Sequence, residues 1–287
     1  MHTSMSVQIK YIRKADLFSV ISTTSFEDRA IKTARLVNEG FERAHRMLIG
    51  DIDAEIICED YFDGSDRVLA YCKKDTDTNI ITVPDFIFTN WKETGVYNYD
   101  ETVIDIADAG EAEPEYNKLF WIGALSHPTR KTLMEISEQD ERIEAYSMDW
   151  KRHFDRDVNV SDATKYVSLK DQTKYKYLID VQGNGYSGRA KMQLFSGRPL
   201  FLADRALKEW FYEDLKPYEH YIPVKEDLSD LISQLNWAEA HERDAKLIGL
   251  NAQKFAIENL MHENAVQRMA KVLIKLSYES IGQDIQI

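Results

Sequence analysis

Three glycines, a serine and an arginine lie close together in the second half of the chain. They are Gly183, Gly185, Ser187, Gly188 and Arg189. Glycine lets the backbone approach a ligand closely, and free backbone N–H groups at the start of a helix favour a phosphate. Serine and arginine add further donors and a positive charge, which suit a diphosphate. This combination predicts a site for a nucleotide or a related phosphate ligand.

The glycine turn must be positioned by the elements around it. Residues 177–181 form an apolar run of the length of a buried strand, and residues 199–203 and 221–224 form two more. Helical periodicity follows the turn as far as Phe195 and returns over residues 206–212. Strands that alternate with helices are typical of a parallel sheet with crossover connections. We therefore expect an α/β domain that binds a nucleotide.

A dinucleotide site is an alternative interpretation of the same segment. The glycines satisfy G-x-G-x-x-G, and Asp204 follows the next strand, where an acid that binds a ribose is expected. Arg189 weighs against this alternative, because its charge directly after the third glycine suits a diphosphate. His220, at the start of the third strand, is either a structural histidine or a contact to the nucleotide or its leaving phosphate. An NAD(P)-dependent oxidoreductase thus remains the less favoured function.

A second strand, loop and helix come earlier in the chain. Residues 118–125 predict a buried strand, and a polar loop with Ser126 and Arg130 follows it. Ser126 or Thr129 could cap the next helix, and Pro128 suits a first helical turn. The loop therefore has the composition of a second anion-facing segment.

Three D-x-D triplets raise the question of a metal. They occupy residues 51–53, 75–77 and 155–157, and such a pair of carboxylates could hold a divalent ion against a diphosphate. The chain has 49 acidic residues, so triplets of this kind are expected by chance. We predict no metal site.

Composition limits the classes of protein that the chain can be. Its 287 residues, 44% hydrophobic and 30% charged, suffice for two globular domains. A formal net charge of -13 argues against nonspecific nucleic-acid binding, which depends on neutralising phosphates. The two cysteines, Cys58 and Cys72, are too few for a disulfide framework, and no signal-peptide or membrane-spanning pattern occurs. These features predict a cytoplasmic protein.

The remaining segments are assigned by periodicity and composition. Residues 1–50 are expected to be mostly helical, and the acidic residues 100–115 are expected to form a loop or linker. The further expected strands are residues 54–58, 67–72 and 79–83, and the expected C-terminal packing helices are residues 244–255 and 266–276.

Residues 174 to about 255 contain a series of ordered motifs. They are KYKY at 174–177, the glycine turn at 183–189, EWFY at 209–212, LKPY at 215–218, HYIPVK at 220–225 and DLSDL at 227–231. With these motifs the segment resembles glycosyltransferase family 90, which includes Rumi-type protein O-glucosyltransferases, fungal capsule xylosyltransferases and bacterial proteins that modify lipopolysaccharide. Upstream, Gly123, Ser126 and Arg130 resemble the family's strand and loop, and residues 84–91 resemble its proline-aromatic segment.

The resemblance implies an α/β fold of the GT-B type, with two Rossmann-like domains facing a central cleft. It implies an inverting, metal-independent transfer of a sugar from a UDP-sugar to a hydroxyl group, with no cofactor. We place the N-terminal acceptor-side domain at residues 1–155 and the UDP-sugar-binding domain at residues 156–265. Residues 266–287 would form a C-terminal helix that could pack back on the N-terminal domain.

Residue by residue, the resemblance implies a donor site around the glycine turn. Arg189 would pair with the diphosphate, with Ser187 beside it, and Ser126 would lie on the opposite wall. The full set of expected donor contacts is Ser126, Arg130, Gly183, Gly185, Ser187, Gly188, Arg189, Asp204, His220 and Tyr221.

The catalytic base is where the sequence departs from the animal members. Those members have an Asp just before the proline segment, whereas here Asp77 lies too early and Asp85 lies directly after Pro84. A base must reach the acceptor hydroxyl, and we favour Asp85 over Asp77 because it opens a loop after a strand. A degenerate module that binds a UDP-sugar or glycan without turnover remains an alternative.

The small number of cysteines resembles the bacterial branch of the family. That branch implies a lipopolysaccharide, capsule or other glycan acceptor. Peripheral contact with the inner membrane is a further expectation that follows from it.

Overall fold

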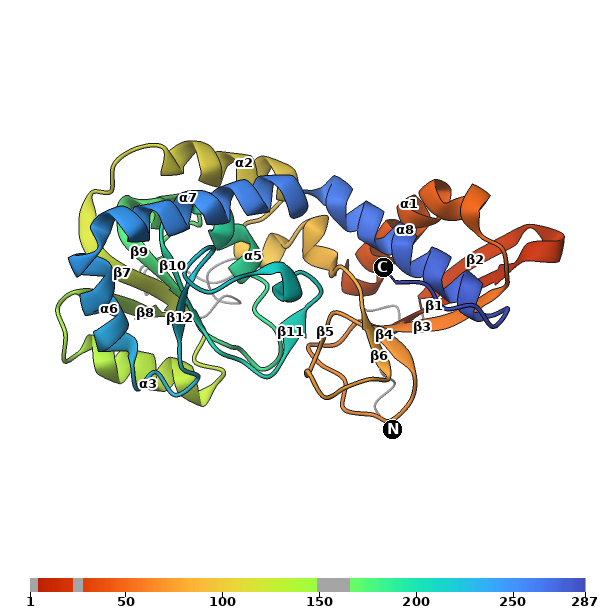
Figure 1. The fold of residues 1–287 in the computed structure, drawn as a ribbon, viewed down its shortest axis with the longest axis horizontal. Coiled ribbons are helices and arrows are strands. Elements are labelled where there is room, and N and C mark those ends of the chain that lie inside the picture. The colour runs from red at the N-terminus through yellow and green to blue at the C-terminus, as the bar shows by residue number, and fades with distance from the viewer. Residues whose placement is uncertain (1–4, 23–27, 149–165, 287) are drawn as a thin grey trace, which may run out of the picture. The chain divides into compact units, whose positions relative to one another are not determined.

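A computed structural model describes residues 5–22, 28–148 and 166–286. The chain forms two compact units, each with its own sheet (Figure 1). Unit 1 comprises Met1–Thr89, Ala206–Tyr212 and Met261–Ile287, and unit 2 comprises Asn90–Arg205 and Glu213–Leu260. Both units therefore draw on segments that are distant in the sequence.

Unit 1 contains a mixed five-stranded sheet in the order β2-β1-β3-β4-β6. The pairs β1–β2 and β1–β3 are antiparallel, whereas β3–β4 and β4–β6 are parallel. A separate two-stranded ribbon joins β5 (Cys72–Lys73) to β11 (Lys208–Glu209). The strands of the larger sheet are β1 (Ser6–Ile12), β2 (Leu17–Ser22), β3 (Ile52–Ile57), β4 (Val68–Ala70) and β6 (Ile80–Thr82).

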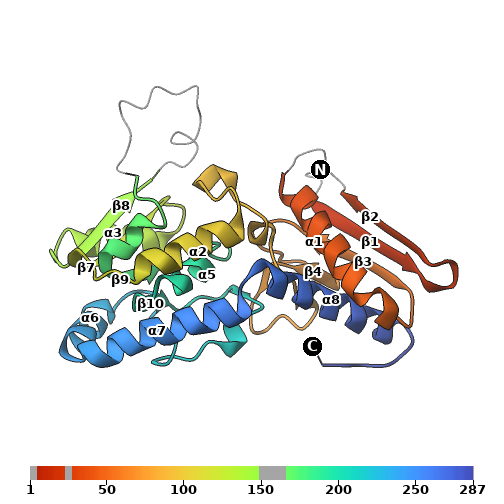
Figure 2. The same ribbon diagram turned by 90° about the horizontal axis from the view of Figure 1, so that it is seen from above.

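Two long helices pack against each other in unit 1. Helix α1 (Asp28–Ala44) lies beside α8 (His262–Glu279) in both ribbon views (Figures 1 and 2). A Cβ at Gly40 of α1 would lie 2.9 Å from the Cβ of Met269, so the helices approach closely there. The buried positions of α8 recur every three or four residues, as expected for an amphipathic helix. They are Ala265, Val266, Met269, Ala270, Val272, Leu273 and Ser277.

Unit 2 contains a fully parallel five-stranded sheet in the order β12-β10-β9-β7-β8. From β7 the chain forms β8 on one side and then returns to form β9 on the other side. In doubly wound sheets this reversal opens a crevice at the carboxyl ends of the two central strands, and ligands bind there. The strands are β7 (Tyr116–Gly123), β8 (Ile143–Ser147), β9 (Tyr175–Asp180), β10 (Leu200–Ala203) and β12 (Ile222–Val224).

Helices bury the strands of unit 2. Helices α3 (Pro128–Ser137), α6 (Leu231–Ala240) and α7 (Glu242–Asn259) share one hydrophobic cluster with the sheet. Helix α2 (Tyr99–Gly110) packs on the short turn Leu194–Ser196, which follows α5 (Ala190–Gln193). Within the described residues, none of the helices is both long enough and apolar enough to cross a bilayer.

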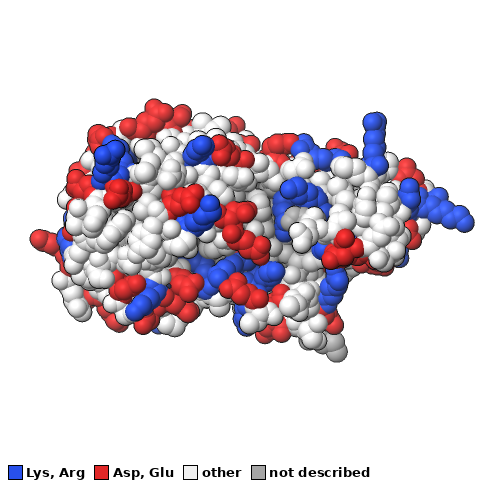
Figure 3. All heavy atoms as spheres, in the orientation of Figure 1, with Lys and Arg blue, Asp and Glu red and all other residues white. Residues whose placement is uncertain are grey.

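The expected strands occur where the sequence placed them, and the α/β class is confirmed. Figure 3 shows acidic and basic side chains mixed over the surface that it draws. The facing arrangement of two domains around a cleft stays a prediction, as does the GT-B description that depends on it.

Three local expectations were wrong. Residues 6–22 form the β1–β2 hairpin and not a helix. The acidic segment 100–115 contains most of α2, because Tyr99, Val103 and Ile106 bury one face of it and Asn98 caps its start. Residues 206–212 form β11 and a turn in place of the expected helix.

The domain division also differs from the one expected. The sequence placed the boundary near residue 155, whereas the structure divides the chain between Thr89 and Asn90. The physical reason is that β7 pairs with both β8 and β9, which brings residues 116–147 into the sheet of unit 2. At the other end, the C-terminal helix begins at His262 and packs on α1.

Helix α7 approaches the loop before β10 so closely that only glycine fits at position 249. A Cβ at Gly249 would lie 2.8 Å from both the carbonyl carbon of Arg198 and the nitrogen of Pro199. Alanine favours a helix by about 1 kcal/mol over glycine, but this clash with backbone atoms cannot be relieved by a rotamer change. We expect Gly249→Ala to lower the free energy of unfolding by about 1–3 kcal/mol in urea denaturation.

The matched control for this experiment is Leu250→Ala, which changes the exposed neighbour of Gly249. We expect its effect to stay within about 0.5 kcal/mol. Equal stability of the two variants would show that α7 can move away from the loop at no cost.

Candidate functional site

A pocket opens at the carboxyl ends of β7 and β9, where the strand order of unit 2 reverses. Its cavity volume is about 110 Å³. Gly123 ends β7 and lines it from one side, and the loop after β9 lines it from the other with Ser187, Gly188 and Arg189. Arg130 of α3 completes the polar wall.

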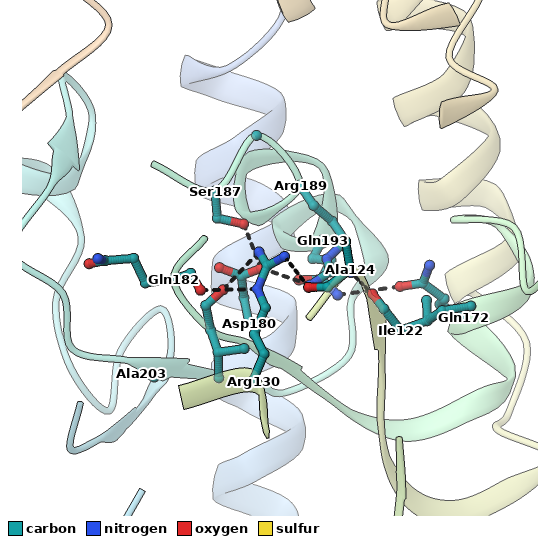
Figure 4. A network of polar contacts seen from close by, with 12 residues as sticks. Ile122, Ala124, Arg130, Gln172, Asp180, Gln182, Ser187, Arg189, Gln193 and Ala203 are labelled. Carbon is teal, nitrogen blue, oxygen red and sulfur yellow. Dashed lines mark hydrogen bonds and ion pairs between the residues drawn. The ribbon is translucent and has the colours of Figure 1, made fainter. Parts of the chain in front are cut away.

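The loop after β9 folds back onto the end of its own strand. Asp180, the last residue of β9, is fully buried and accepts a hydrogen bond of 2.7 Å from the Ser187 hydroxyl. The same Oδ1 atom lies 3.3 Å from Nη2 of Arg189 (Figure 4). Gly183 is tightly enclosed, since a Cβ there would lie 3.0 Å from Nη2 of Arg130.

Arg130 ties the loops after β7 and β9 together. Its Nε donates to the carbonyl of Gln182 at 3.0 Å, and its Nη1 donates to the carbonyl of Ala124 at 2.9 Å and to Oγ of Ser126 at 3.3 Å. Its Nη2 donates to the carbonyl of Val181 at 3.4 Å. Burial lowers the pKa of Arg130 to about 10, and the nearby charge of Arg189 contributes. Such a group gains from an anionic partner.

Arg189 is 9% exposed and points into the same region. Its Nη1 donates to the carbonyl of Ile122, and its Nε has no hydrogen-bond partner among the described residues. Burial lowers the pKa of Arg189, and the carboxylate of Asp180 opposes this shift. The guanidinium carbons of Arg130 and Arg189 lie 5.7 and 5.8 Å from the ring centre of Trp121, within cation–π range.

A third arginine reaches the carboxylate from the end of β10. Nη1 of Arg205 lies 2.8 Å from Oδ2 of Asp180, and its Nη2 donates to the main-chain carbonyl of Asp180 at 3.2 Å. Burial alone would raise the pKa of Asp180, but Arg205 and Arg189 outweigh it and hold the pKa below its usual value. The carboxylate is therefore ionised at neutral pH.

This arrangement can bind an anion with two or more oxygens. Arg130 and Arg189 supply charge and forked donors at the pocket wall, and Ser187 lies beside them. Trp91 and Tyr186 add aromatic surface to the same pocket, which suits a planar group. A diphosphate joined to a base has both of these parts.

The structure brings most of the expected donor contacts together. Ser187, Gly188, Arg189 and Arg130 line the pocket, Gly183 touches Arg130, and Ser126 accepts from it. Gly185 is buried in the same loop.

Asp204, His220 and Tyr221, like Ser126, Gly183 and Gly185, are not among the described residues that line the pocket. Asp204 is exposed, and its carboxylate accepts the N–H of Arg205 at 2.8 Å. Nδ1 of His220 accepts the N–H of Lys216 at 3.2 Å, and its ring packs on Phe255 at 5.0 Å. Tyr221 follows His220 and pairs with Pro217 in an isolated β-bridge. These contacts match the structural interpretation of His220.

The two candidate bases lie in unit 1. Asp85 is 1% exposed and caps the short helix Phe86–Phe88, with Oδ1 accepting the N–H of Ile87 at 3.2 Å. Asp77 belongs to a tight turn, in which its Oδ2 accepts the N–H of Lys74 at 3.0 Å. Both carboxylates thus help to shape the local backbone.

The D-x-D triplets that the structure describes have basic or backbone partners. Asp53 lies 3.8 Å from Lys10, Asp75 lies 2.6 Å from Lys208, and Asp51 accepts the N–H of Arg13. The triplet at 155–157 lies outside the described residues. In the part of the chain that is described, no group of three or more His, Cys, Asp or Glu side chains is arranged to hold a metal ion.

Sequence reasoning missed two residues at the base of the site. Asp180 ends an apolar strand, and a charged residue at that position could have signalled a role in binding. Arg205 follows Asp204 directly, but its approach to Asp180 depends on the pairing of β9 with β10. Sequence reasoning also did not assign Trp91 and Tyr166 to the site. Both line the pocket, but they lie far from the glycine turn in the sequence.

The glycine turn and its surroundings belong to a recognised sequence family. Residues 57–279 match the family model described as Glycosyl transferase family 90. The chain belongs to this family. The resemblance predicted from the sequence is thereby confirmed, whereas membership of the bacterial branch stays a prediction.

Two curated relatives match different shares of the chain. Protein O-glucosyltransferase 2 of Danio rerio is 30% identical over 200 residues, which are 69% of this chain and 40% of that protein. Protein O-glucosyltransferase 1 of Homo sapiens is 31% identical over 149 residues, which are 50% of this chain and 38% of that protein. The chain therefore spans about two fifths of these relatives.

A solved structure shows a more distant likeness to this family 90 chain. It is Anabaena Alr3699/HepE in complex with UDP and glucose, with 11% sequence identity and a TM-score of 0.44. The match covers 69% of this chain and 57% of that chain.

Because the carboxylate of Asp180 is ionised, the free energy of unfolding of the chain should depend on pH in the acidic range. Because its pKa is lower in the folded state than in the unfolded state, its contribution is complete above about pH 4 and disappears as the pH falls through the folded value. Asp180→Asn should lower the free energy of unfolding at pH 7 by about 3 kcal/mol, since it leaves buried arginine charge without its counter-ion.

Denaturant unfolding of both proteins at pH 7 and pH 3 checks this expectation. The difference in the free energy of unfolding between them should be smaller at pH 3, because this pH lies below the pKa of an Asp in the unfolded chain and the contribution of the carboxylate has begun to fall. A difference that is the same at both pH values would mean that Asp180 is not ionised in the folded protein.

Proposed function

We propose that the chain is an inverting, metal-independent glycosyltransferase that moves a sugar from a UDP-sugar to a hydroxyl group of a glycan. The observation that carries this proposal is a pair of arginines, the partly buried Arg130 and the buried Arg189, at the point where a parallel sheet reverses its strand order. Membership of family 90 supports the reaction class.

The chemistry assigned to the arginines is stabilisation of the leaving group. As the bond between the sugar and the diphosphate breaks, negative charge builds up on the phosphate oxygens. Arg130 and Arg189 hold positive charge in a largely water-excluded place, where electrostatic stabilisation is strong. In the proposed reaction they take the role that a metal ion has in other transferases.

Asp85 is the proposed base that accepts the proton of the acceptor hydroxyl. It follows β6, at the carboxyl end of parallel strands in the sheet of unit 1, whereas Asp77 lies in the turn before β6. The proposal for Asp85 rests on the family's proline-aromatic segment and on this position.

The names of the relatives suggest the donor sugar, whereas the acceptor is proposed from the family resemblance. Proteins named O-glucosyltransferases match the chain, so UDP-glucose is the first donor to test and UDP-xylose is the second. The proposed acceptor is a glycan such as lipopolysaccharide or capsule, reached at the inner membrane surface.

A thermal-shift experiment tests the donor site without knowledge of the acceptor. UDP at 100 times its dissociation constant should stabilise the folded chain by about 2.7 kcal/mol, and the melting temperature should rise by several degrees. The rise should persist in EDTA. Stabilisation by NADH alone would instead favour the oxidoreductase alternative.

The arginine assignment predicts a selective loss of UDP affinity. Arg189→Ala removes a charged donor from the pocket and should weaken UDP binding at least about tenfold in isothermal titration calorimetry. Arg243→Ala, which removes an exposed arginine of α7, is the matched control and should bind UDP normally. Equal UDP affinity in both variants would remove Arg189 from the donor site.

Substitution of the proposed base should separate turnover from binding. Asp85→Asn can still cap the helix that it begins, so the fold should persist. UDP affinity should be unchanged, while the rate of UDP release from a UDP-sugar in the presence of acceptor glycans should fall by about 10²–10⁴. A larger loss in Asp77→Asn would transfer the role to Asp77. UDP binding without turnover in the unmodified chain would favour the binding-module alternative.

A further inference from the structure

Asp180 lies behind the donor pocket and not in its wall. It is fully buried at the end of β9, and it is not among the described residues that line the pocket. Ser187, Arg189 and Arg205 nevertheless converge on its two carboxylate oxygens. A single buried carboxylate thus connects two loops at the carboxyl edge of the sheet (Figure 4).

The donors that meet at Asp180 have different surroundings. Both Ser187 and Arg189 line the pocket. The one hydroxyl hydrogen of Ser187 is donated to Asp180, whereas Nε of Arg189 has no hydrogen-bond partner among the described residues and can donate to a ligand. Arg205 is 3% exposed, and its further bonds go to the main-chain carbonyls of Ala203 and Asp180. Arg205 is not among the described residues that line the pocket, so we place its effect on a ligand through the carboxylate.

We propose that Asp180, held ionised and oriented by Arg205, is a positioning residue for the donor diphosphate. It fixes the Arg189 guanidinium directly, and through its bond to Ser187 it fixes the loop that carries both residues, before the ligand arrives. Donors that are already oriented bind more tightly, because the cost of ordering them does not fall on the binding step. This inference rests on the proposed function of the pocket.

The charge of the same carboxylate should also affect UDP affinity, in the opposite direction to the positioning effect. A negative charge behind an anion site repels the ligand, so its removal should tighten binding if charge alone mattered. Loss of orientation should weaken binding. The direction of the change in UDP affinity therefore separates positioning from a purely electrostatic role.

The experiment compares the UDP affinity of Asp180→Asn with that of the unmodified chain by calorimetry at pH 7.5. UDP carries the diphosphate that every UDP-sugar shares. Asn keeps an acceptor for Ser187 but loses the charge that holds Arg189, so we expect binding to weaken about tenfold, a loss typical of removing a partner that orients a binding group. Asp105→Asn, at an exposed position of α2, is the control and should bind UDP normally.

A second variant decides the question if Asp180→Asn folds poorly by circular dichroism. Arg205→Lys keeps the positive charge but cannot form the same fork, so we expect UDP binding to weaken about threefold or more, and Arg205→Met to weaken it further. Unchanged or tighter binding in a folded Asp180→Asn or Arg205→Lys variant would overturn the positioning role alone. Absence of UDP binding by the unmodified chain would overturn the proposed function together with it.

Discussion

Arg189 is buried and Arg130 is partly buried, and the arrangement of unit 2 depends on how the charge of these two guanidinium groups is accommodated. Moving a charge from water to a protein interior is costly unless hydrogen bonds and counter-charge replace the lost hydration. Backbone carbonyls at the ends of β7 and β9, one indole ring and one carboxylate supply that replacement. The interactions that hold the charge therefore also fix the ends of the strands and the course of the loops.

Local sequence patterns were sufficient for most of the parallel strands and for the glycine turn. Gly183, Ser187 and Arg189 are neighbours in the chain, so their chemistry can be recognised without knowledge of the fold. Asp180 and Arg205 lie 25 residues apart and meet only because β9 and β10 pair in parallel. The part of the site that depends on sheet order is thus the part that the sequence alone did not reveal.

The errors in the fold have similar physical origins. The turn between β1 and β2 uses Asp16 in a left-handed conformation, with φ of 47°, so the usual glycine signal of a hairpin is missing. In α2 the acidic residues face outward and obscure the buried stripe of Tyr99, Val103 and Ile106. Strand β7 is apolar enough to be recognised, but only its pairing with β9 shows which sheet it joins.

The packing of α1 on α8 also constrains the order in which the chain can fold. Arg43 of α1 and Gln267 of α8 are hydrogen-bonded across 224 positions of sequence. Domains generally fold as units while the chain is being synthesised from its N-terminus. Residues 90–260 can therefore complete the sheet of unit 2 while α1 still lacks its partner. The first elements of unit 1 are therefore synthesised before unit 2, and α8 is synthesised after it. Until α8 is available, the apolar face of α1 needs protection from premature association.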